Sequence, residues 1–214
     1  MLDLHCHILP GIDHGAQNLN QARQMLVAAK EQGITRIVAT PHVYSADFDR
    51  SAARHACETL RPYAQQMNIE LVLGYEFNIS ALDYEHLERA SAFCIDGTNT
   101  LLLEMPFDLW PPHWKHIFYD LQARGMEIIL AHPERYRAVQ SNLQILEKLA
   151  QMDVMFQVDV PQSLRRFSKQ NKVLRTLIDM DRLHYAASDA HQASDYGQFA
   201  RSIQKLSKHL QIME

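Results

Sequence analysis

The chain has 214 residues, of which 47% are hydrophobic and 21% charged, and its formal net charge is −4. These values are ordinary for a globular protein, and the length suits a single domain over residues 1–214 with a sizeable core. The acidic balance gives no general attraction to nucleic acid, so we expect no nucleic-acid partner.

Apolar runs with β-branched character recur along the chain and predict seven strands. These runs cover residues 2–8, 34–40, 69–76, 100–105, 126–131, 154–160 and 183–188. Most are separated by segments with helical periodicity. The first such segment begins at Asn18 or Asn20 and ends at Gly33, a natural helix C-cap. Further helices are predicted around residues 118–125, 143–150, 174–178 and 199–206.

This alternation of strands and helices predicts parallel strands and an α/β architecture. An open doubly wound sheet and a closed barrel would both satisfy it. Candidate metal ligands follow nearly every predicted strand, and ligands on the edge strands of an open sheet could not reach one point. In a barrel the carboxyl ends of all strands surround the same mouth. We therefore expect a (β/α)7 barrel with the site at the carboxyl ends of its strands.

Two segments from opposite ends of the chain carry paired ligands. His5 and His7 alternate in the first predicted strand, and Asp189 and His191 alternate in residues 187–191, which are also interpreted as a short strand at the end of the last apolar run. Side chains on a strand repeat with period two, so each pair is expected to face one way. Cys6 then points to the other side, as a small core residue.

The middle of the chain adds more residues of the same kind. His42, Glu76, Glu104 and His132 each follow an apolar run, and His14 completes a set of nine candidates. A lone HxH or a lone Glu is common by chance, but the joint pattern is not. Nine ligands exceed the needs of one metal and suffice for two or three. A set of His, Asp and Glu without Cys suits Mn²⁺, Fe²⁺ or Zn²⁺.

The cysteines and the lengths of the apolar runs bear on the compartment. Cys6, Cys57 and Cys94 are an odd number without CxxC spacing, which favours a reducing environment. No apolar run approaches the ~20 residues that span a bilayer, and the N-terminus lacks a charged region followed by an apolar core. We therefore expect a cytoplasmic protein without a transmembrane segment.

The ordered motifs resemble those of the polymerase and histidinol phosphatase (PHP) superfamily. Within it, the chain looks like the bacterial manganese-dependent tyrosine-protein phosphatases of capsule and exopolysaccharide operons, and the match runs in order over nearly the whole chain. The phrase His7-Ile8-Leu9-Pro10-Gly11-Ile12-Asp13 followed by Gly15 matches that branch closely. The other motifs are His5-Cys6-His7, Thr40-Pro41-His42, Gly74-Tyr75-Glu76, Glu104, Ala131-His132-Pro133-Glu134-Arg135-Tyr136 and Ser188-Asp189-Ala190-His191.

The resemblance implies a distorted (β/α)7 barrel that holds three divalent metals, with Mn²⁺ first and Fe or Zn²⁺ as alternatives. By analogy, a metal-bridging hydroxide attacks phosphorus and Arg135 steadies the phosphate oxygens, and the client is the tyrosine-rich tail of a polysaccharide-assembly kinase. An Arg fork suits phosphate, although a salt bridge with a neighbouring Glu is the alternative role. The implied metal ligands are His5, His7, Glu76 and Asp189 for the first ion, Glu76, Glu104 and His132 for the second, and His14, His42 and His191 for the third.

The chain departs from the capsule-type pattern in three places. His14 stands where that branch usually has Asp, which bears on the charge and identity of the third metal. Residues 192–197 lack the arginine and prolines common there, which bears on phosphotyrosine recognition. The chain also ends soon after the last predicted helix, so we expect that a C-terminal element that often assists oligomerisation is absent. The oligomeric state itself stays open.

Other enzyme classes are weighed against this interpretation. A cysteine-dependent tyrosine phosphatase needs an Arg six residues after its Cys, which no cysteine here has. Metal-dependent amidohydrolases commonly place a carboxylated lysine at a strand end, and no predicted strand ends in Lys. An inactive binding module would have lost part of the ligand set, and here the set is complete.

A small phosphate ester, such as histidinol phosphate or a nucleotide, is the remaining alternative substrate. The loops 43–50 and 106–116 would decide between it and a phosphotyrosine protein. Trp110 and Trp114 in the second loop would either stack on a planar leaving group or pack the start of a helix. Asp159, after the sixth predicted strand, is a candidate acid for the leaving group or a partner for a ligating His.

Overall fold

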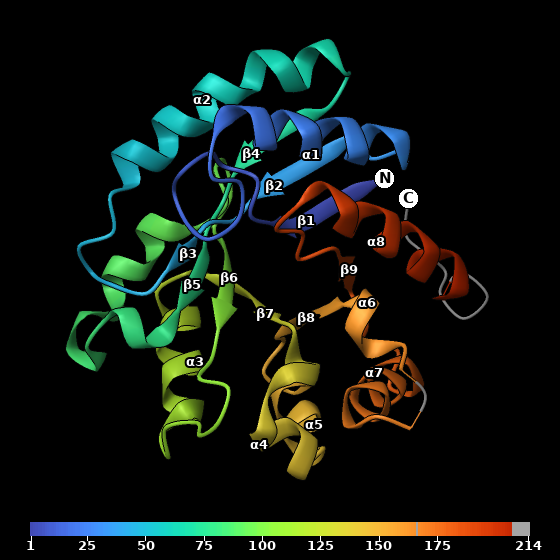
Figure 1. Cartoon of the computed structure of the whole chain (residues 1–214). Helices are drawn as coiled ribbons and strands as arrows, with labels where there is room; N and C mark the ends of the chain where they lie inside the picture. Colours follow the sequence, from blue (N-terminus) through green and yellow to red (C-terminus); the bar gives the residue numbers. More distant parts are fainter. Residues whose placement is uncertain (166, 207–214) are drawn as a thin grey trace.

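The computed structural model describes residues 1–165 and 167–206. The strands occupy the middle of the molecule and the helices lie around them, as Figure 1 shows. Every strand pair in this part of the chain is parallel. The predicted α/β class with parallel strands is therefore confirmed.

Hydrogen bonding arranges these strands in two sheets. The first has the order β1 (Leu2–Cys6), β2 (Arg36–Ala39) and β4 (Glu70–Leu73). The second has the order β3 (His42–Val43), β5 (Glu76–Asn78), β6 (Thr100–Glu104), β7 (Glu127–Ala131), β8 (Met155–Asp159) and β9 (Tyr185–Ala187). Each predicted run contains a strand, whereas the short strands β3 and β5 were not predicted separately.

The two sheets adjoin where the chain passes from β2 to β3 and from β4 to β5. Pro41, which has no N–H to offer a ladder, separates β2 from β3. At the same level the Gly74 N–H donates to the Ala39 carbonyl at 2.8 Å, and the Glu76 N–H donates to the Pro41 carbonyl at 3.1 Å. Strands β3 and β5 of the second sheet therefore continue the paths of β2 and β4 of the first.

The first and last strands, β1 and β9, also meet. Cys6 forms a parallel bridge with Ala190, and the His7 N–H donates to the Ala190 carbonyl at 2.8 Å. The buried Asp3 carboxylate accepts from both the backbone N–H (3.0 Å) and the hydroxyl (2.7 Å) of Ser188. The segment that follows β9 is thereby joined to β1.

Helices follow most of the strands. They are α1 (Leu19–Glu31), α2 (Arg50–Gln66), α3 (Trp114–Ala123), α4 (Arg137–Ser141), α5 (Gln144–Ala150), α6 (Val160–Ser163), α7 (Lys169–Asp179) and α8 (Ala193–Leu206). Single 3-10 turns form η1 (Ile79–Ala81) and η3 (Pro133–Arg135), and a longer 3-10 segment forms η2 (Tyr84–Phe93). Asn18 caps α1 by accepting from the Gln21 N–H at 3.0 Å, so the earlier of the two predicted starts is the correct one.

Helix α2 was missed from the sequence. Asp49 caps its start, and Pro62 lies inside it. Its buried face consists mostly of small residues, which give a weak apolar signal although their spacing is helical: Ala53, Ala56, Cys57, Leu60 and Ala64.

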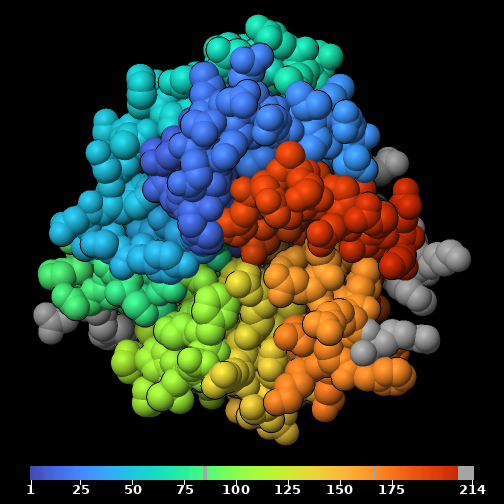
Figure 2. Space-filling view, in the orientation of Figure 1, coloured from blue at the N-terminus to red at the C-terminus, as the bar shows by residue number. Residues whose placement is uncertain are grey.

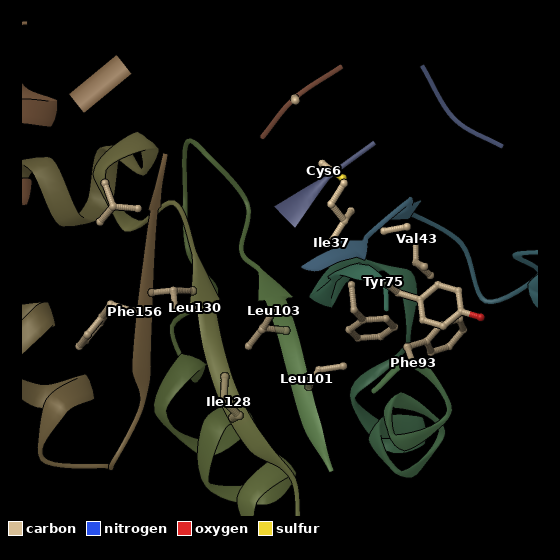
Figure 3. Close-up of a cluster of buried hydrophobic side chains, with 14 of the residues drawn as sticks. Cys6, Ile37, Val43, Tyr75, Phe93, Leu101, Leu103, Ile128, Leu130 and Phe156 are labelled. Atoms are coloured by element: carbon tan, nitrogen blue, oxygen red, sulfur yellow. The ribbon is translucent and has the colours of Figure 1, made fainter. Parts of the chain in front are cut away.

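Apolar side chains of the strands pack against the helices around them. Figure 3 shows Leu101 and Leu103 of β6 beside Ile128 and Leu130 of β7, with Phe156 of β8 nearby, and all five are 0% or 1% exposed. Helix α8 packs on α1, and Figure 2 shows the red atoms of the α8 segment next to the blue atoms of the N-terminal residues. Within the described ranges, no helix is both long and apolar enough to cross a membrane.

A pair of neighbouring residues on α3 tests this packing. Phe118 is 0% exposed and Tyr119 is 65% exposed. Phe118→Ala is expected to lower the free energy of unfolding by about 3–5 kcal/mol, because it leaves a cavity in the core. Tyr119→Ala, the matched control, should cost less than about 0.5 kcal/mol. Equal losses in urea denaturation would contradict the assignment of the buried face.

Candidate metal centre

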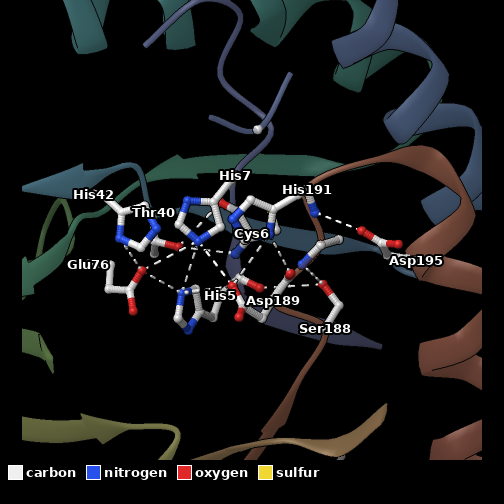
Figure 4. A network of polar contacts seen from close by, with 12 residues as sticks. His5, Cys6, His7, Thr40, His42, Glu76, Ser188, Asp189, His191 and Asp195 are labelled. Carbon is white, nitrogen blue, oxygen red and sulfur yellow. Dashed lines mark hydrogen bonds and ion pairs between the residues drawn. The ribbon is translucent and has the colours of Figure 1, made fainter. Parts of the chain in front are cut away.

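The Glu76 carboxylate, on the first residue of β5, lies among four histidines. It is 1% exposed. Its Oε2 is 3.2 Å from His5 Nε2, 3.4 Å from His7 Nε2 and 2.7 Å from His42 Nδ1. Its Oε1 is 2.7 Å from His132 Nε2. Figure 4 shows Glu76 with its contacts to His42, His7 and His5, so one of the three candidate carboxylates contacts four candidate histidines.

The second carboxylate, Asp189, lies on the other side of the N-terminal histidines. Its Oδ1 is 3.1 Å from His7 Nε2 and 3.5 Å from His5 Nε2. Its Oδ2 accepts a 2.7 Å hydrogen bond from Arg135 Nη1. The Asp189 carbonyl contacts His191 Nδ1 at 2.9 Å. Side chains from β1, from the residue after it and from the segment after β9 therefore lie next to one another.

The geometry that orients the C-terminal pair differs from the prediction. Strand β9 ends at Ala187, so Asp189 and His191 do not alternate on a strand. Asp189 instead adopts a left-handed conformation with φ 47. The Ser188 contacts with Asp3 hold the chain just before this turn. The pairing of Asp189 with His191 is thus produced by a turn fixed to β1.

Two further candidates lie at the margin of the cluster. Glu104 Oε1 is 3.9 Å from His132 Nε2, and Glu104 Oε2 accepts from Asn78 Nδ2 at 2.8 Å. The ring of His14 lies 4.4 Å from that of His191 and 4.8 Å from that of His42, measured between centroids. His14 is therefore adjacent to the site through its ring.

Nitrogen and oxygen atoms that could ligate a metal form four groups, each with its atoms within 4.8 Å of one another. Eight of the nine predicted ligands belong to these groups, and among the residues that were searched His14 is the predicted ligand outside them. The groups are His7, His42 and His191; His5, His7 and Asp189; His5, Glu76 and His132; and His42, Glu76 and Glu104.

Buried atoms without hydrogen-bond partners show that these residues fit a metal. His42 Nδ1, Glu76 Oε2, Glu104 Oε1 and His191 Nε2 are buried and unpartnered in the structure as described. His42 Nδ1 and Glu76 Oε2 are 2.7 Å apart but do not meet hydrogen-bond geometry. Buried polar atoms are normally paired, whereas ligands about 2.1 Å from one ion lie roughly 3 Å apart at right angles. The short distance between these unpaired atoms is therefore that expected for ligand atoms bound to the same cation.

Two residues hold the histidine rings from behind, and the sequence did not assign them a role. Asp13 Oδ2 accepts from His7 Nδ1 at 2.7 Å and from the His42 backbone N–H at 3.2 Å. Gln157 Oε1 accepts from His5 Nδ1 at 2.9 Å. Each contact fixes the proton on Nδ1 and leaves Nε2 free to face the cluster. Asp13 lies inside a quoted motif, but only the folded chain shows what it touches.

The buried charges balance one another in the metal-free protein. Burial disfavours a charged His5, but the carboxylates of Glu76 and Asp189 outweigh it and raise the pKa of His5 to about 10. Burial is likewise outweighed at His7, where hydrogen bonds to Asp13 and Asp189 raise the pKa to about 9. Burial and the nearby charge of Glu76 raise the pKa of Glu104 to about 7. Protons on His5 and His7 thus supply positive charge that a metal cation would otherwise supply.

Arg135 and Asp159 lie beside the cluster. Arg135 is in η3, and its ion pair is with Asp189, at 2.7 Å, rather than with a neighbouring Glu. Asp159 ends β8 and is 2% exposed. Burial, together with the charge of Asp189, raises the pKa of Asp159 to about 7. Gln157 takes the position beside His5 that was one of the two roles suggested for Asp159.

The tryptophans of the loop 106–116 pack inward. Trp110 is 5% exposed, and its ring lies 5.5 Å from that of Trp114 and 6.4 Å from that of Phe118. The pair therefore packs the start of α3, which was the simpler of the two roles considered. Phe107 of the same loop instead stacks on His132.

The fold and this cluster define a class of protein: an α/β protein with a histidine- and carboxylate-rich metal centre at the carboxyl ends of parallel strands. The model of the family "Capsular polysaccharide synthesis, CpsB/CapC" matches residues 1–211. The chain belongs to this family.

Individual relatives agree with the family. The chain is 33% identical over 196 residues to the tyrosine-protein phosphatase YwqE of Bacillus subtilis, with 89% of this chain and 77% of that protein covered. It is 30% identical over 200 residues to CapC of Staphylococcus aureus, covering 91% and 78%. A crystal structure from a study of YwqE and of CpsB from Streptococcus pneumoniae, described as unique metal-dependent tyrosine phosphatases, matches with a TM-score of 0.85 at 28% identity. That match covers 100% of this chain and 89% of the other.

Removing the central carboxylate tests the metal centre. Glu76→Gln is expected to abolish stoichiometric metal binding, because Glu76 lies closest to the ring nitrogens of four histidines. Metal content by inductively coupled plasma mass spectrometry, after loading with Mn²⁺ and desalting, measures the effect. Glu70→Gln on β4, where the side chain is 61% exposed, is the control and should retain full metal content. Equal metal content in both variants would refute the assignment.

The pKa values of His5 and His7 predict that metal binding releases protons. Both pKa values lie above 7, at about 10 and about 9, so both rings are protonated at pH 7 in the metal-free protein. A ligating ring must lose that proton, so affinity for Mn²⁺ should rise with pH, by about tenfold per pH unit for each proton released. Calorimetric titration in two buffers of different ionisation enthalpy measures the release. Identical heats in both buffers would contradict the prediction.

Proposed function

We propose that the protein is a metal-dependent protein-tyrosine phosphatase, with a phosphotyrosine protein as its substrate. The observation that carries the proposal is the convergence of eight candidate ligands, with unpartnered buried ligand atoms, in a member of the CpsB/CapC family. As the family resemblance implies, the client would be a tyrosine kinase of polysaccharide assembly that is phosphorylated on its tyrosine-rich tail.

The proposed centre holds three divalent cations, of which Mn²⁺ is the first choice and Fe²⁺ or Zn²⁺ the alternatives. When bound, such ions supply a nucleophile at neutral pH and stabilise the charge on phosphoryl oxygens. The proposed ligand sets are His5, His7, Glu76 and Asp189; Glu76, Glu104 and His132; and His14, His42 and His191. One donor group contains His5, His7 and Asp189 of the first set. For the second set, one group joins Glu76 to His132 and another joins Glu76 to Glu104. For the third set, one group joins His42 to His191, and the ring contacts of His14 add that residue.

Side chains of the protein would bind and protonate the substrate. The Arg135 guanidinium, next to Asp189, offers further N–H groups that suit phosphate oxygens. Asp159 has a pKa of about 7 because it is buried and near Asp189, so its carboxyl group holds a proton in part of the molecules at neutral pH. We assign Asp159 the donation of that proton to the phenolic oxygen that leaves.

We also infer that the two sheets are parts of one distorted (β/α)7 barrel, formed by residues 1–214 as a single domain. The contacts of β2 and β4 with the start of the second sheet support this, as do the hydrogen bonds that join β1 to the segment after β9. A barrel mouth would explain why ligands from so many strands reach one point.

The substrate assay tests the proposal directly. The enzyme is loaded with Mn²⁺ and offered a phosphotyrosine peptide, histidinol phosphate and a nucleoside monophosphate, each with and without a chelator. We expect the highest kcat/KM for the peptide, and loss of all activity on chelation. A higher kcat/KM for histidinol phosphate or the nucleotide would place the protein in a branch of the superfamily that hydrolyses small phosphate esters at the same metal centre. If the metal-loaded protein hydrolysed none of the three substrates, it would be a binding module without catalytic activity.

Arg135 provides a second test of the proposal. Arg135→Lys keeps the charge but removes the planar fork, and should lower kcat/KM for the phosphopeptide by about 10²–10³-fold at unchanged metal content. The exposed Arg124, at the end of α3, is the matched control, and Arg124→Lys should leave kcat/KM unchanged. Full activity in Arg135→Lys would show that Arg135 serves only as a partner of Asp189.

A further inference from the structure

Two exposed aromatic side chains lie directly on candidate ligands. Phe107 stacks on the ring of His132 with centroids 5.5 Å apart and an interplanar angle of 21°. Tyr44 stacks on the ring of His42 at 4.7 Å and 22°. Among the side chains that the structure describes, the other exposed aromatic residues are Tyr119 and Phe167, which make no such contact. The exposed aromatic surface beside the centre therefore comes from these two residues.

Phe107 is held in place yet remains open to solvent. Its ring lies 4.9 Å from Arg135 Cζ and 5.7 Å from the Tyr136 ring, and its carbonyl accepts from the Arg137 N–H at 2.9 Å. It is nevertheless 37% exposed. These contacts fix the ring of Phe107 while leaving it exposed, so a ligand can pack on it without a large loss of side-chain conformational entropy.

The space beside Phe107 is a pocket that reaches Arg135. Its volume is about 310 Å³, near the lower end of the range for small-molecule sites. One wall is aromatic, and the others are charged or amide side chains. The lining residues are Phe107, Asp108, Arg135, Arg137, Gln162 and Gln170. The pocket thus places a phosphate-binding fork and an aromatic face side by side.

Tyr44 belongs to the loop after β3 and is 56% exposed. Its hydroxyl lies 3.5 Å from His42 Nε2, and its ring covers that of His42. Phe107 and Tyr44 therefore come from the two loops, 106–116 and 43–50, that the sequence predicted to decide the substrate. The tryptophans of the first loop are turned into the core instead.

We propose that Phe107 and Tyr44 determine specificity for aryl phosphates by packing on the ring of the substrate while its phosphate lies on the centre and Arg135. This inference rests on the proposed function. In phosphotyrosine a single oxygen atom separates phosphorus from the aromatic ring. When the phosphate lies on the candidate metal ligands, the ring of the substrate therefore lies next to side chains that contact those ligands, as Phe107 and Tyr44 do. Aromatic rings stabilise one another through offset or edge contacts. An alkyl phosphate has no ring, so the faces of Phe107 and Tyr44 would stay in contact with water. The pair discriminates by this difference.

Variants that remove or keep each ring test the inference. Phe107→Leu and Tyr44→Leu remove an aromatic face, and Phe107→Tyr and Tyr44→Phe keep it. For each Mn²⁺-loaded variant, kcat and KM are measured with a phosphotyrosine peptide and with the same peptide carrying phosphoserine. Each Leu variant should lower the tyrosine-to-serine ratio of kcat/KM by about 3–10-fold through KM, while the ring-keeping variants preserve it. Tyr119→Leu on α3 is the control.

A binding measurement separates recognition from turnover. Phenylphosphonate and methylphosphonate are titrated calorimetrically into each Mn²⁺-loaded variant, and metal content is measured in parallel. We expect the wild-type preference for the phenyl compound to fall in both Leu variants by the same factor as the kinetic ratio, at unchanged metal content.

Failure of the inference and failure of the proposed function give different results. Equal losses for both ligands, or loss of metal in the Leu variants, would show that the rings only support His132 and His42, and would overturn the inference alone. A wild-type protein that binds metal but hydrolyses no phosphotyrosine peptide would overturn the proposed function, and the inference with it.

Discussion

The burial of the Glu76 carboxylate is the constraint on which the arrangement of the site depends. A carboxylate that is 1% exposed is costly unless positive charge lies next to it, and here His5, His7, His42 and His132 all approach within 3.4 Å. His5 lies in β1 and His7 just after it, whereas His42 begins β3 and His132 follows β7, so three distant parts of the sequence supply them. The carboxylate is thus stabilised only when the strands converge, either by protons on the histidines or by cations in their place.

The meeting of the two chain ends is the second requirement. Asp3 holds Ser188 through two hydrogen bonds, and the left-handed turn that follows places Asp189 beside His5 and His7. Ligands from the first strand and from the segment after the last strand therefore share one site only in the folded chain. Folding and assembly of the centre are coupled, because no short stretch of the sequence contains a complete ligand set.

Most of the features predicted from the sequence are decided locally, although α2 was missed because its buried face consists mostly of small residues. The other features that were missed arise from contacts between distant segments. The strands and the Asn18 cap follow from nearby residues, and the candidate ligands could be recognised because each ends an apolar run or lies in a motif. The supports of the rings, Asp13 and Gln157, act through contacts that no spacing reveals. The turn at Asp189 was predicted as a strand, because its left-handed conformation depends on β1. Phe107 carries no signal that separates it from the other apolar residues of its loop.

In the functional protein, the Glu76 carboxylate is expected to lie between cations. Crystals grown with Mn²⁺, measured at the manganese absorption edge, would locate the ions by anomalous scattering. We expect three peaks among the nine side chains, two of them at bonding distance from the Glu76 carboxylate. Fewer than two peaks at Glu76, or peaks only at surface carboxylates, would contradict the account.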